Sequence, residues 1–138
     1  MKAIINTDGA CRGNPGPSGA GVVIRNEHME VVETFAGYLG VTTNNVAEYQ
    51  ALIEGLGVAQ RLGYTELLLR LDSQLVVRQV RGEYHARDPR IVDLLDKARG
   101  ILQGFEKWDI VHVPRTMNAL ADKLANDGID NHQRALTA

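Results

Sequence analysis

The sequence predicts one α/β domain built on a mixed five-stranded β-sheet with helices packed against it. Three β-rich runs come first in the chain, and later β-rich runs alternate with stretches of helical period, an order typical of layered α/β domains. With 138 residues, 44% of them hydrophobic, the chain is long enough to bury a single core. We expect the first three strands to be antiparallel and the strands after the first helix to be parallel.

The first third of the chain predicts a three-stranded meander. Residues 2–8 lean apolar and fit a strand, whereas residues 9–18 carry glycine, proline, asparagine and serine and fit a loop. Strand character returns over residues 19–25 and 31–39, and the short polar turn between these two runs favours an antiparallel hairpin.

Helical and extended segments then alternate. Apolar residues at three- and four-residue steps predict a helix after residue 44, with Gly63 as its C-terminal stop. Residues 66–71 form a compact apolar run that predicts a buried strand. Ser73 is well suited to cap a short helix after that strand.

The last third predicts two more helices separated by one strand. Asp88 followed by Pro89 pairs a cap with a first-turn proline and opens a helix. Residues 107–113 alternate as a strand does, and Asn118 is placed to cap the final helix. We expect residues 129–138 to be a frayed C-terminal tail.

Composition indicates a cytoplasmic protein. Cys11 is the only cysteine, so no intrachain disulfide can form and a reducing compartment is the default. No apolar run approaches the roughly 20 residues that cross a bilayer, and the N-terminus lacks the pattern of an export signal. We expect no membrane association.

Four acidic residues stand where a carboxylate has little structural use. Asp8 and Asp72 each end a predicted strand, and Glu48 and Asp122 lie in alanine-rich helical stretches. Because sites in open α/β sheets form at the carboxyl ends of strands, the four side chains are expected to meet. Two like charges 4 Å apart cost about 4 kcal/mol at an effective dielectric near 20. Such a cluster therefore predicts divalent cations and metal-dependent phosphoryl transfer.

Each of these carboxylates also has a simpler structural interpretation. An aspartate at a strand end often forms a turn or caps a helix, as Asp72 before Ser73 would, and a glutamate near a helix N-terminus stabilises the helix dipole. The spacing of the four residues alone leaves both interpretations open.

The net charge of −2 is compatible with a polyanionic substrate. Nucleic-acid-binding proteins usually present a basic face, so this value weakly disfavours them. Removing the four candidate ligands from the 17 acidic residues leaves 13 against 15 basic ones. Bound cations would offset the charge of the ligands themselves.

Four sequence blocks resemble the signature blocks of type 1 ribonuclease H. They occur in that family's order and spacing, over about residues 1–128: Thr7–Pro17, Thr42–Glu48, Asp72–Gln74 and Asn118–Ala125. The resemblance implies a ribonuclease H catalytic domain over residues 1–128, with that family's fold. It also implies endonucleolytic hydrolysis of the RNA strand of RNA–DNA hybrids, giving 5′-phosphate and 3′-hydroxyl ends.

The resemblance implies catalytic roles for the acidic residues. Asp8, Glu48, Asp72 and Asp122 match the family's four catalytic, metal-binding carboxylates, which hold two Mg²⁺ or Mn²⁺ ions. In this scheme Asp8 bridges both ions and Glu48 also senses the RNA 2′-hydroxyl. Asp122 matches the most exposed and most loosely held ligand.

Further residues match the family's substrate contacts: Gly9, Ala10, Cys11, Asn14, Thr43, Asn44, Asn45 and Gln74. The first three form a flexible stretch whose backbone can approach a sugar closely. The amide side chains match contacts in the minor groove, and Thr43 matches a residue that holds a phosphate of the DNA strand. Asn14 as a turn residue and Thr43 as a helix cap are the structural alternatives.

Two features depart from the family pattern. Many bacterial members carry a basic, tryptophan-rich protrusion after the short helix, and only residues 81–87 separate that helix from Asp88 here. Many members also have a histidine-bearing loop before the last carboxylate. Residues 113–118 contain no histidine, and Arg115 occupies roughly that position, where it could help a phosphate leave.

Two other functions remain as alternatives. One is DNA cleavage by a ribonuclease H-fold nuclease of the resolvase or integrase kind, which the amides Asn44, Asn45 and Gln74 disfavour. The other is non-catalytic binding of hybrids, which the four carboxylates disfavour. We expect an RNA–DNA hybrid as the partner, no obligate protein partner, and a monomer.

Overall fold

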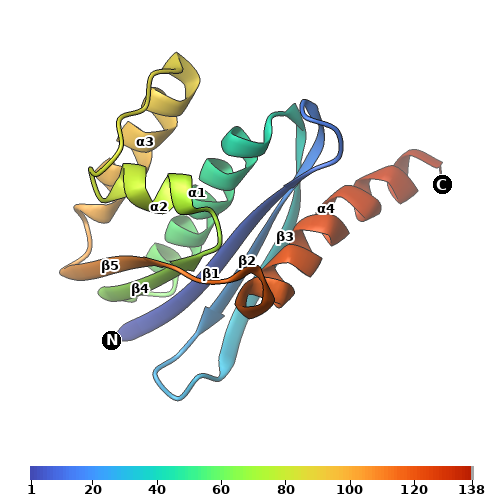
Figure 1. Ribbon diagram of the computed structural model, residues 1–138. Helices are drawn as coiled ribbons and strands as arrows, with labels where there is room; N and C mark the ends of the chain where they lie inside the picture. The colour runs from blue at the N-terminus through green and yellow to red at the C-terminus, as the bar shows by residue number, and fades with distance from the viewer. Residues whose placement is uncertain (138) are drawn as a thin grey trace.

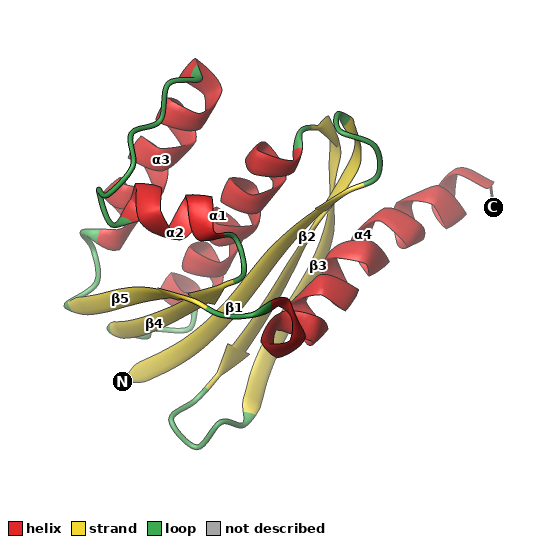
Figure 2. Cartoon of the chain, viewed as in Figure 1, coloured by secondary structure: helices red, strands yellow, loops and turns green. Residues whose placement is uncertain are grey.

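The computed structural model describes residues 1–137 as one layered α/β unit (Figures 1 and 2). Its strands are β1 (Lys2–Cys11), β2 (Gly16–Arg25), β3 (Val31–Thr42), β4 (Glu66–Leu71) and β5 (Lys107–His112). Its helices are α1 (Asn44–Arg61), α2 (Gln74–Val80), α3 (Pro89–Leu102), the 3₁₀ turn η1 (Arg115–Asn118) and α4 (Ala119–Thr137). This order of elements confirms the predicted one.

The five strands form one mixed sheet in the order β3-β2-β1-β4-β5. β1 pairs antiparallel with β2, and β2 pairs antiparallel with β3, as the predicted meander requires. β1 and β4 are parallel, and so are β4 and β5, which confirms the mixed sheet. The parallel pairing brings the carboxyl ends of β1 and β4 to the same edge.

Helices cover both faces of the sheet (Figure 1). A Cβ on Gly55 of α1 would lie 3.5 Å from Val22 of β2, whereas a Cβ on the preceding strand residue, Gly21, would collide with the backbone of Ala121 in α4. Because successive strand residues point to opposite faces, α1 and α4 lie on opposite sides of the sheet. The main core lies on the α1 side, where Ile5, Leu52, Leu56, Leu69 and Leu102 are buried.

Glycines allow α4 to lie directly against β2 and β3. A Cβ on Gly19 would collide with the carbonyl of Ala125, and a Cβ on Gly128 of α4 would collide with the backbone of Gly37. Any larger residue at these positions would push the helix away from the sheet. This close packing fixes the orientation of α4 on the sheet, and with it the position of Asp122.

Side-chain caps begin three helices as their sequences suggest. Ser73 accepts a hydrogen bond from the Val76 N–H, and Asp88, followed by Pro89 at the first turn of α3, accepts one from Arg90 N–H. Thr43 caps α1 by accepting from Val46 N–H at 3.4 Å. These bonds satisfy N–H groups that a helix leaves free in its first turn.

The predicted capping role of Asn118 is wrong. Its side chain is buried and bonds to β1 instead: Nδ2 donates to the Thr7 carbonyl at 2.9 Å, and Oδ1 accepts from Asn6 Nδ2 at 3.0 Å. The residue ends η1 rather than preceding a free helix terminus. Its physical role is to tie the start of α4 to the central strand.

The predicted loop over residues 9–18 is also longer than the real one. β1 continues to Cys11 and β2 begins at Gly16, with Cys11 paired to Ser18. Glycine and proline lower strand propensity, but backbone pairing with a neighbouring strand overrides that preference here. The extended hairpin carries residues 9–11 along the edge of the candidate site.

Residues 129–137 continue α4, where the sequence suggested a frayed tail. Ile129 is fully buried, and Asp130 pairs with Arg12 at 2.7 Å. The His132 ring stacks on Tyr38 of β3 with ring centroids 3.7 Å apart. These contacts hold α4 against the rest of the domain as far as His132. None of the helices in residues 1–137 is long and apolar enough to span a membrane.

Candidate active site

Three of the predicted carboxylates meet at the carboxyl edge of the sheet. Thr7 of β1 is paired with Leu71 of β4, so Asp8, still within β1, and Asp72, directly after β4, lie at the same level on adjacent parallel strands. Glu48 enters from the second turn of α1. One oxygen from each of these side chains lies within 4.8 Å of the others. The strand ends and the helix thus converge as the pattern predicted.

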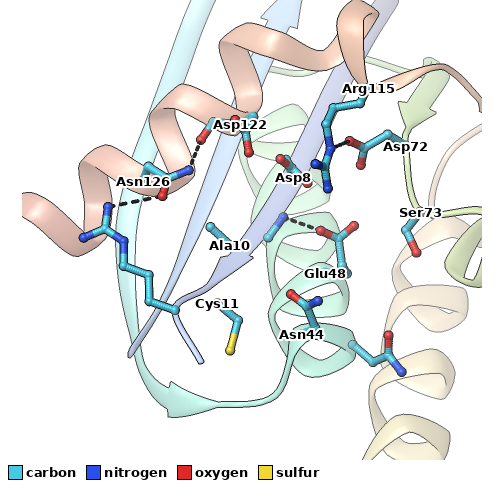
Figure 3. A pocket seen from close by; sticks show the side chains of 13 residues that line it. Asp8, Ala10, Cys11, Asn44, Glu48, Asp72, Ser73, Arg115, Asp122 and Asn126 are labelled. Atoms are coloured by element: carbon cyan, nitrogen blue, oxygen red, sulfur yellow. Dashed lines mark hydrogen bonds and ion pairs between the residues drawn. The ribbon is translucent and has the colours of Figure 1, made fainter. Parts of the chain in front are cut away.

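Glu48 is held by the backbone of β1. The Gly9 N–H donates to Glu48 Oε1 at 2.7 Å (Figure 3). α1 approaches so closely that a Cβ on Gly9 would lie 2.5 Å from the Glu48 nitrogen. Glycine is therefore required at position 9 for both the contact and the approach.

The second oxygen of Glu48 fits the role of a metal ligand. Oε2 is buried and has no hydrogen-bond partner within residues 1–137. A buried carboxylate oxygen without a partner carries a desolvation penalty, which a divalent cation would remove. The three clustered side chains offer only oxygen donors, the set that Mg²⁺ and Mn²⁺ favour. The residues present therefore fit a divalent cation.

Burial, together with the neighbouring carboxylates, raises the pKa of Asp8 and Glu48. The pKa of Asp8 is raised from 3.8 to about 11, first by burial, then by the negative charge of Glu48, with smaller contributions from Asp72 and Asp122. Burial also raises the pKa of Glu48 to about 7, against the lowering effect of the Gly9 N–H. Without a cation, the cluster holds protons that a free carboxylate would release at neutral pH.

Asp122 faces the same pocket from α4 (Figure 3). It is half-buried, and its carbonyl accepts a hydrogen bond from the Asn126 side chain at 3.0 Å. The pocket has a volume of about 440 Å³ and is lined by Asp8, Gly9, Ala10, Cys11, Arg12, Asn44, Asn45, Glu48, Asp72, Ser73, Arg115, Asp122 and Asn126. All four predicted carboxylates line this single cavity.

The predicted substrate contacts divide into two groups. Gly9, Ala10, Cys11, Asn44, Asn45 and Arg115 line the pocket, whereas Asn14, Thr43 and Gln74 do not. Thr43 caps α1, the structural role considered as its alternative, whereas Asn14 Oδ1 accepts from the Asn44 N–H at 3.0 Å and so ties the loop after β1 to the start of α1. Gln74 is exposed at the start of α2, beside the pocket residue Ser73.

Arg115 lies beside the carboxylates without being buried. Its Nε is 4.0 Å from Asp72 Oδ2, and its side chain is 88% exposed. An exposed guanidinium at this distance remains free to move toward an incoming anion. Histidine is absent from the lining of the pocket in the part of the chain that the structure describes.

Sequence reasoning missed three pocket residues, Arg12, Ser73 and Asn126. Arg12 lies within the first signature block, so its position next to Cys11 was a usable signal. Asn126 is one helical turn after Asp122, which places both on the same side of α4. Ser73 was recognised for its cap alone.

The segment in which many family members carry the basic protrusion is short here, as the sequence indicates. α2 ends at Val80 and α3 begins at Pro89, so only a brief connection joins them. Arg78 at the end of α2 lies over the Tyr84 ring of this connection, 5.2 Å from its centroid. The connection therefore folds back on α2 instead of forming a separate basic helix.

Comparisons with known proteins agree with this site. The family described as reverse transcriptase-like matches residues 6–128, which include all four carboxylates. A bifunctional protein of Mycobacterium tuberculosis is 42% identical over 131 residues, 94% of this chain and 36% of the relative. Ribonuclease HI of Halobacterium salinarum is 44% identical over 124 residues, 90% of this chain and 62% of the relative. The chain thus spans less than two thirds of either relative's length.

Solved structures show the same fold over nearly the whole chain. RNase H1 from Halobacterium salinarum superposes with a TM-score of 0.93 and 41% identity, covering 95% of this chain and 99% of that one. LC11-RNase H1, solved in complex with an RNA/DNA hybrid, superposes with a TM-score of 0.91 and 42% identity, covering 95% and 99%. The sequence blocks, the sheet order and these similarities together show that the chain belongs to the type 1 ribonuclease H family, as a short form without the basic protrusion.

Proposed function

We propose that the protein cuts the RNA strand of RNA–DNA hybrids endonucleolytically, with divalent cations, leaving 5′-phosphate and 3′-hydroxyl ends. The observation that carries this proposal is the convergence of Asp8, Glu48 and Asp72 in an open pocket. A relative with the same fold, 42% identical, has been solved with a hybrid bound. Oxygen ligands in an open pocket suit a phosphodiester better than an apolar substrate.

Four carboxylates would hold the cations, which we propose to be two Mg²⁺ or Mn²⁺ ions. When bound, such ions supply Lewis-acid stabilisation of the charge that develops on phosphate oxygens. Asp8 lies at the centre of the cluster, where Glu48, Asp72 and Asp122 all affect its pKa. Asp122 is less buried than Asp8 and Glu48, in keeping with a loosely held ligand.

Selection of the RNA strand would come from groups beside the carboxylates. The 2′-hydroxyl distinguishes RNA from DNA at a given position. The backbone of Gly9, Ala10 and Cys11 lines the pocket, and Glu48 lies against Gly9, so these groups can meet a sugar at the cut position. Asn44 and Asn45 line the same pocket and supply amides for the minor groove.

Three further contacts are proposed outside the lining. Thr43 at the start of α1 would hold a phosphate of the DNA strand, because helix N-termini favour anions. Asn14 and Gln74 would reach the minor groove from the edge of the pocket. Arg115, which does line the pocket, would assist departure of the cleaved phosphate from its position beside Asp72.

Cleavage of labelled RNA–DNA hybrid, duplex DNA and duplex RNA, each with Mg²⁺ and with Mn²⁺, tests the proposal. We expect hybrid to be cut in its RNA strand and duplex DNA to remain intact. Cleavage of duplex DNA with an intact hybrid would instead support a DNA nuclease on this fold. Tight hybrid binding without cleavage under either metal would indicate a binding module. Sedimentation of the same sample tests the expected monomer.

A further inference from the structure

Arg12 is a basic residue in the wall of a pocket rich in acidic groups, and the proposed function gives it no role. Arg12 and Arg115 are the two basic side chains in the lining that the structure describes. Arg115 lies beside Asp72, and Asp122 approaches Asp8 from α4 (Figure 3), whereas Arg12 follows the end of β1 and bonds to Asn126, one turn of α4 after Asp122. A polyanion crossing the pocket would therefore meet positive charge at both ends of the cluster.

Two residues of α4 fix the orientation of this guanidinium. Arg12 Nη1 lies 2.7 Å from Asp130 Oδ1, and Nη2 donates to Asn126 Oδ1 at 3.2 Å. Asn126 donates in turn to the Asp122 carbonyl. A guanidinium carries five N–H donors, and the remaining ones make no hydrogen bond within residues 1–137. The Arg12 side chain is 38% exposed, so those donors are accessible to a ligand.

The position of Arg12 suits a neighbouring phosphate. Asn126 and Asp130 follow Asp122 by one and two turns of α4, or roughly 6 and 12 Å along the helix axis. A strand cut at the carboxylates presents a phosphate at every nucleotide, so another phosphate comes within reach of a group at this distance. Ala10 and Cys11, between Asp8 and Arg12 in sequence, line the path between the two positions.

A purely structural role does not account well for the ion pair of Arg12 with α4. An exposed ion pair contributes roughly 0–1 kcal/mol to stability. α4 is already seated against the sheet by the close approaches at Gly19, Gly21 and Gly128. We propose that Arg12 binds a phosphate of the RNA strand a few nucleotides from the cleaved bond, with its guanidinium oriented by Asp130 and Asn126. This inference rests on the proposed function, because it takes the RNA strand as the ligand.

The test compares Arg12→Ala with Arg61→Ala. Arg61 is also ion-paired, with Glu33, and lies on α1 about 20 Å from Glu48 along the helix axis. Both variants remove one positive charge and one exposed ion pair. Binding of labelled hybrid is measured in EDTA over a series of NaCl concentrations, and KM and kcat are measured with Mg²⁺. The EDTA series requires no cleavage.

Loss of one charged phosphate contact predicts that Arg12→Ala raises the Kd and KM for hybrid about tenfold. Loss of one phosphate contact also lowers the slope of log Kd against log salt by roughly 0.7–0.9. We expect kcat to change by less than about twofold, because the contact is remote from the reacting bond. Arg12→Lys should restore the slope, since it keeps the charge, and Arg61→Ala should match the unmodified chain.

The outcomes separate this inference from the proposed function. An unchanged salt slope in Arg12→Ala, or a loss confined to kcat, overturns the phosphate contact while hybrid cleavage by the unmodified chain still stands. A slope that falls equally in Arg61→Ala also overturns it, since the effect would then come from overall charge. If the unmodified chain neither binds nor cuts hybrid, both the proposed function and this inference are wrong.

Discussion

The Gly9 N–H donates to Glu48 Oε1 at 2.7 Å, across 39 positions of the sequence. This single contact joins the end of β1 to the second turn of α1 and holds a buried carboxylate against Asp8. Because Gly9 has no side chain, α1 can lie close enough to β1 for Glu48 to accept this hydrogen bond. The carboxylate cluster therefore depends on backbone packing as much as on its acidic residues.

Gly9→Ala should lower kcat/KM for hybrid by about 10- to 100-fold, since displacing a catalytic group by about 1 Å costs that much. The added Cβ would lie 2.5 Å from the Glu48 nitrogen and force α1 away from β1. The matched control is Gly57→Ala on the same helix, where a Cβ meets nothing within 4 Å. Gly57→Ala should leave kcat/KM unchanged and raise stability by up to about 1 kcal/mol. Equal cleavage by the two variants would contradict this role of Gly9.

The stability of the metal-free protein should fall as pH rises. The folded state raises the pKa of Glu48 from 4.5 to about 7 and that of Asp8 from 3.8 to about 11. Above about pH 4 the folded chain therefore binds more protons at these groups than the unfolded chain does. Their stabilising contribution is complete below pH 4 and is lost as pH rises through 7 and beyond.

Melting temperatures in EDTA between pH 5 and pH 9 check this sign, with Asp8→Asn as the reference. The melting temperature of Asp8→Asn should rise relative to that of the unmodified chain as pH rises, because the substitution removes one charge from the cluster. Mg²⁺ should stabilise the unmodified chain more at pH 9 than at pH 5, since protons compete with the cation at low pH. A pH-independent difference between the two chains would show that the cluster is not protonated in this range.

Asn118→Ala should destabilise the fold by roughly 1–3 kcal/mol, because it leaves a buried partner unpaired. Asn118 is 2% exposed and bonds to both Asn6 and the Thr7 carbonyl. Chemical denaturation measures the change, and Asn131→Ala on an exposed turn of α4 is the control. A loss no larger than that of Asn131→Ala would mean that the tie to β1 carries little energy.

Local patterns in the sequence were sufficient for the order of the elements and for the mixed sheet, whereas the meeting of the carboxylates was indicated by the resemblance of the four sequence blocks rather than by spacing alone. Asp8 and Asp72 each follow a short apolar run, and parallel pairing then brings them together. The contact of Arg12 with Asp130 spans 118 positions and has no local signal. The buried hydrogen bonds of Asn118 could not be predicted for a related reason. The same side-chain amide can either cap a helix or bond to a distant strand, and the local sequence does not distinguish the two. Residues 129–132 make contacts with Arg12 and with Tyr38 of β3 that their own composition does not indicate.

The most direct test of the account is Mg²⁺-dependent cleavage of labelled hybrid by Asp8→Asn, beside Asp93→Asn on the exposed surface of α3. Asp8 lies at the centre of the carboxylate cluster, so its loss should lower kcat by at least about 10³-fold while the chain stays folded. Asp93→Asn should cleave as the unmodified chain does. Appreciable cleavage by folded Asp8→Asn would contradict a metal-dependent nuclease centred on this cluster.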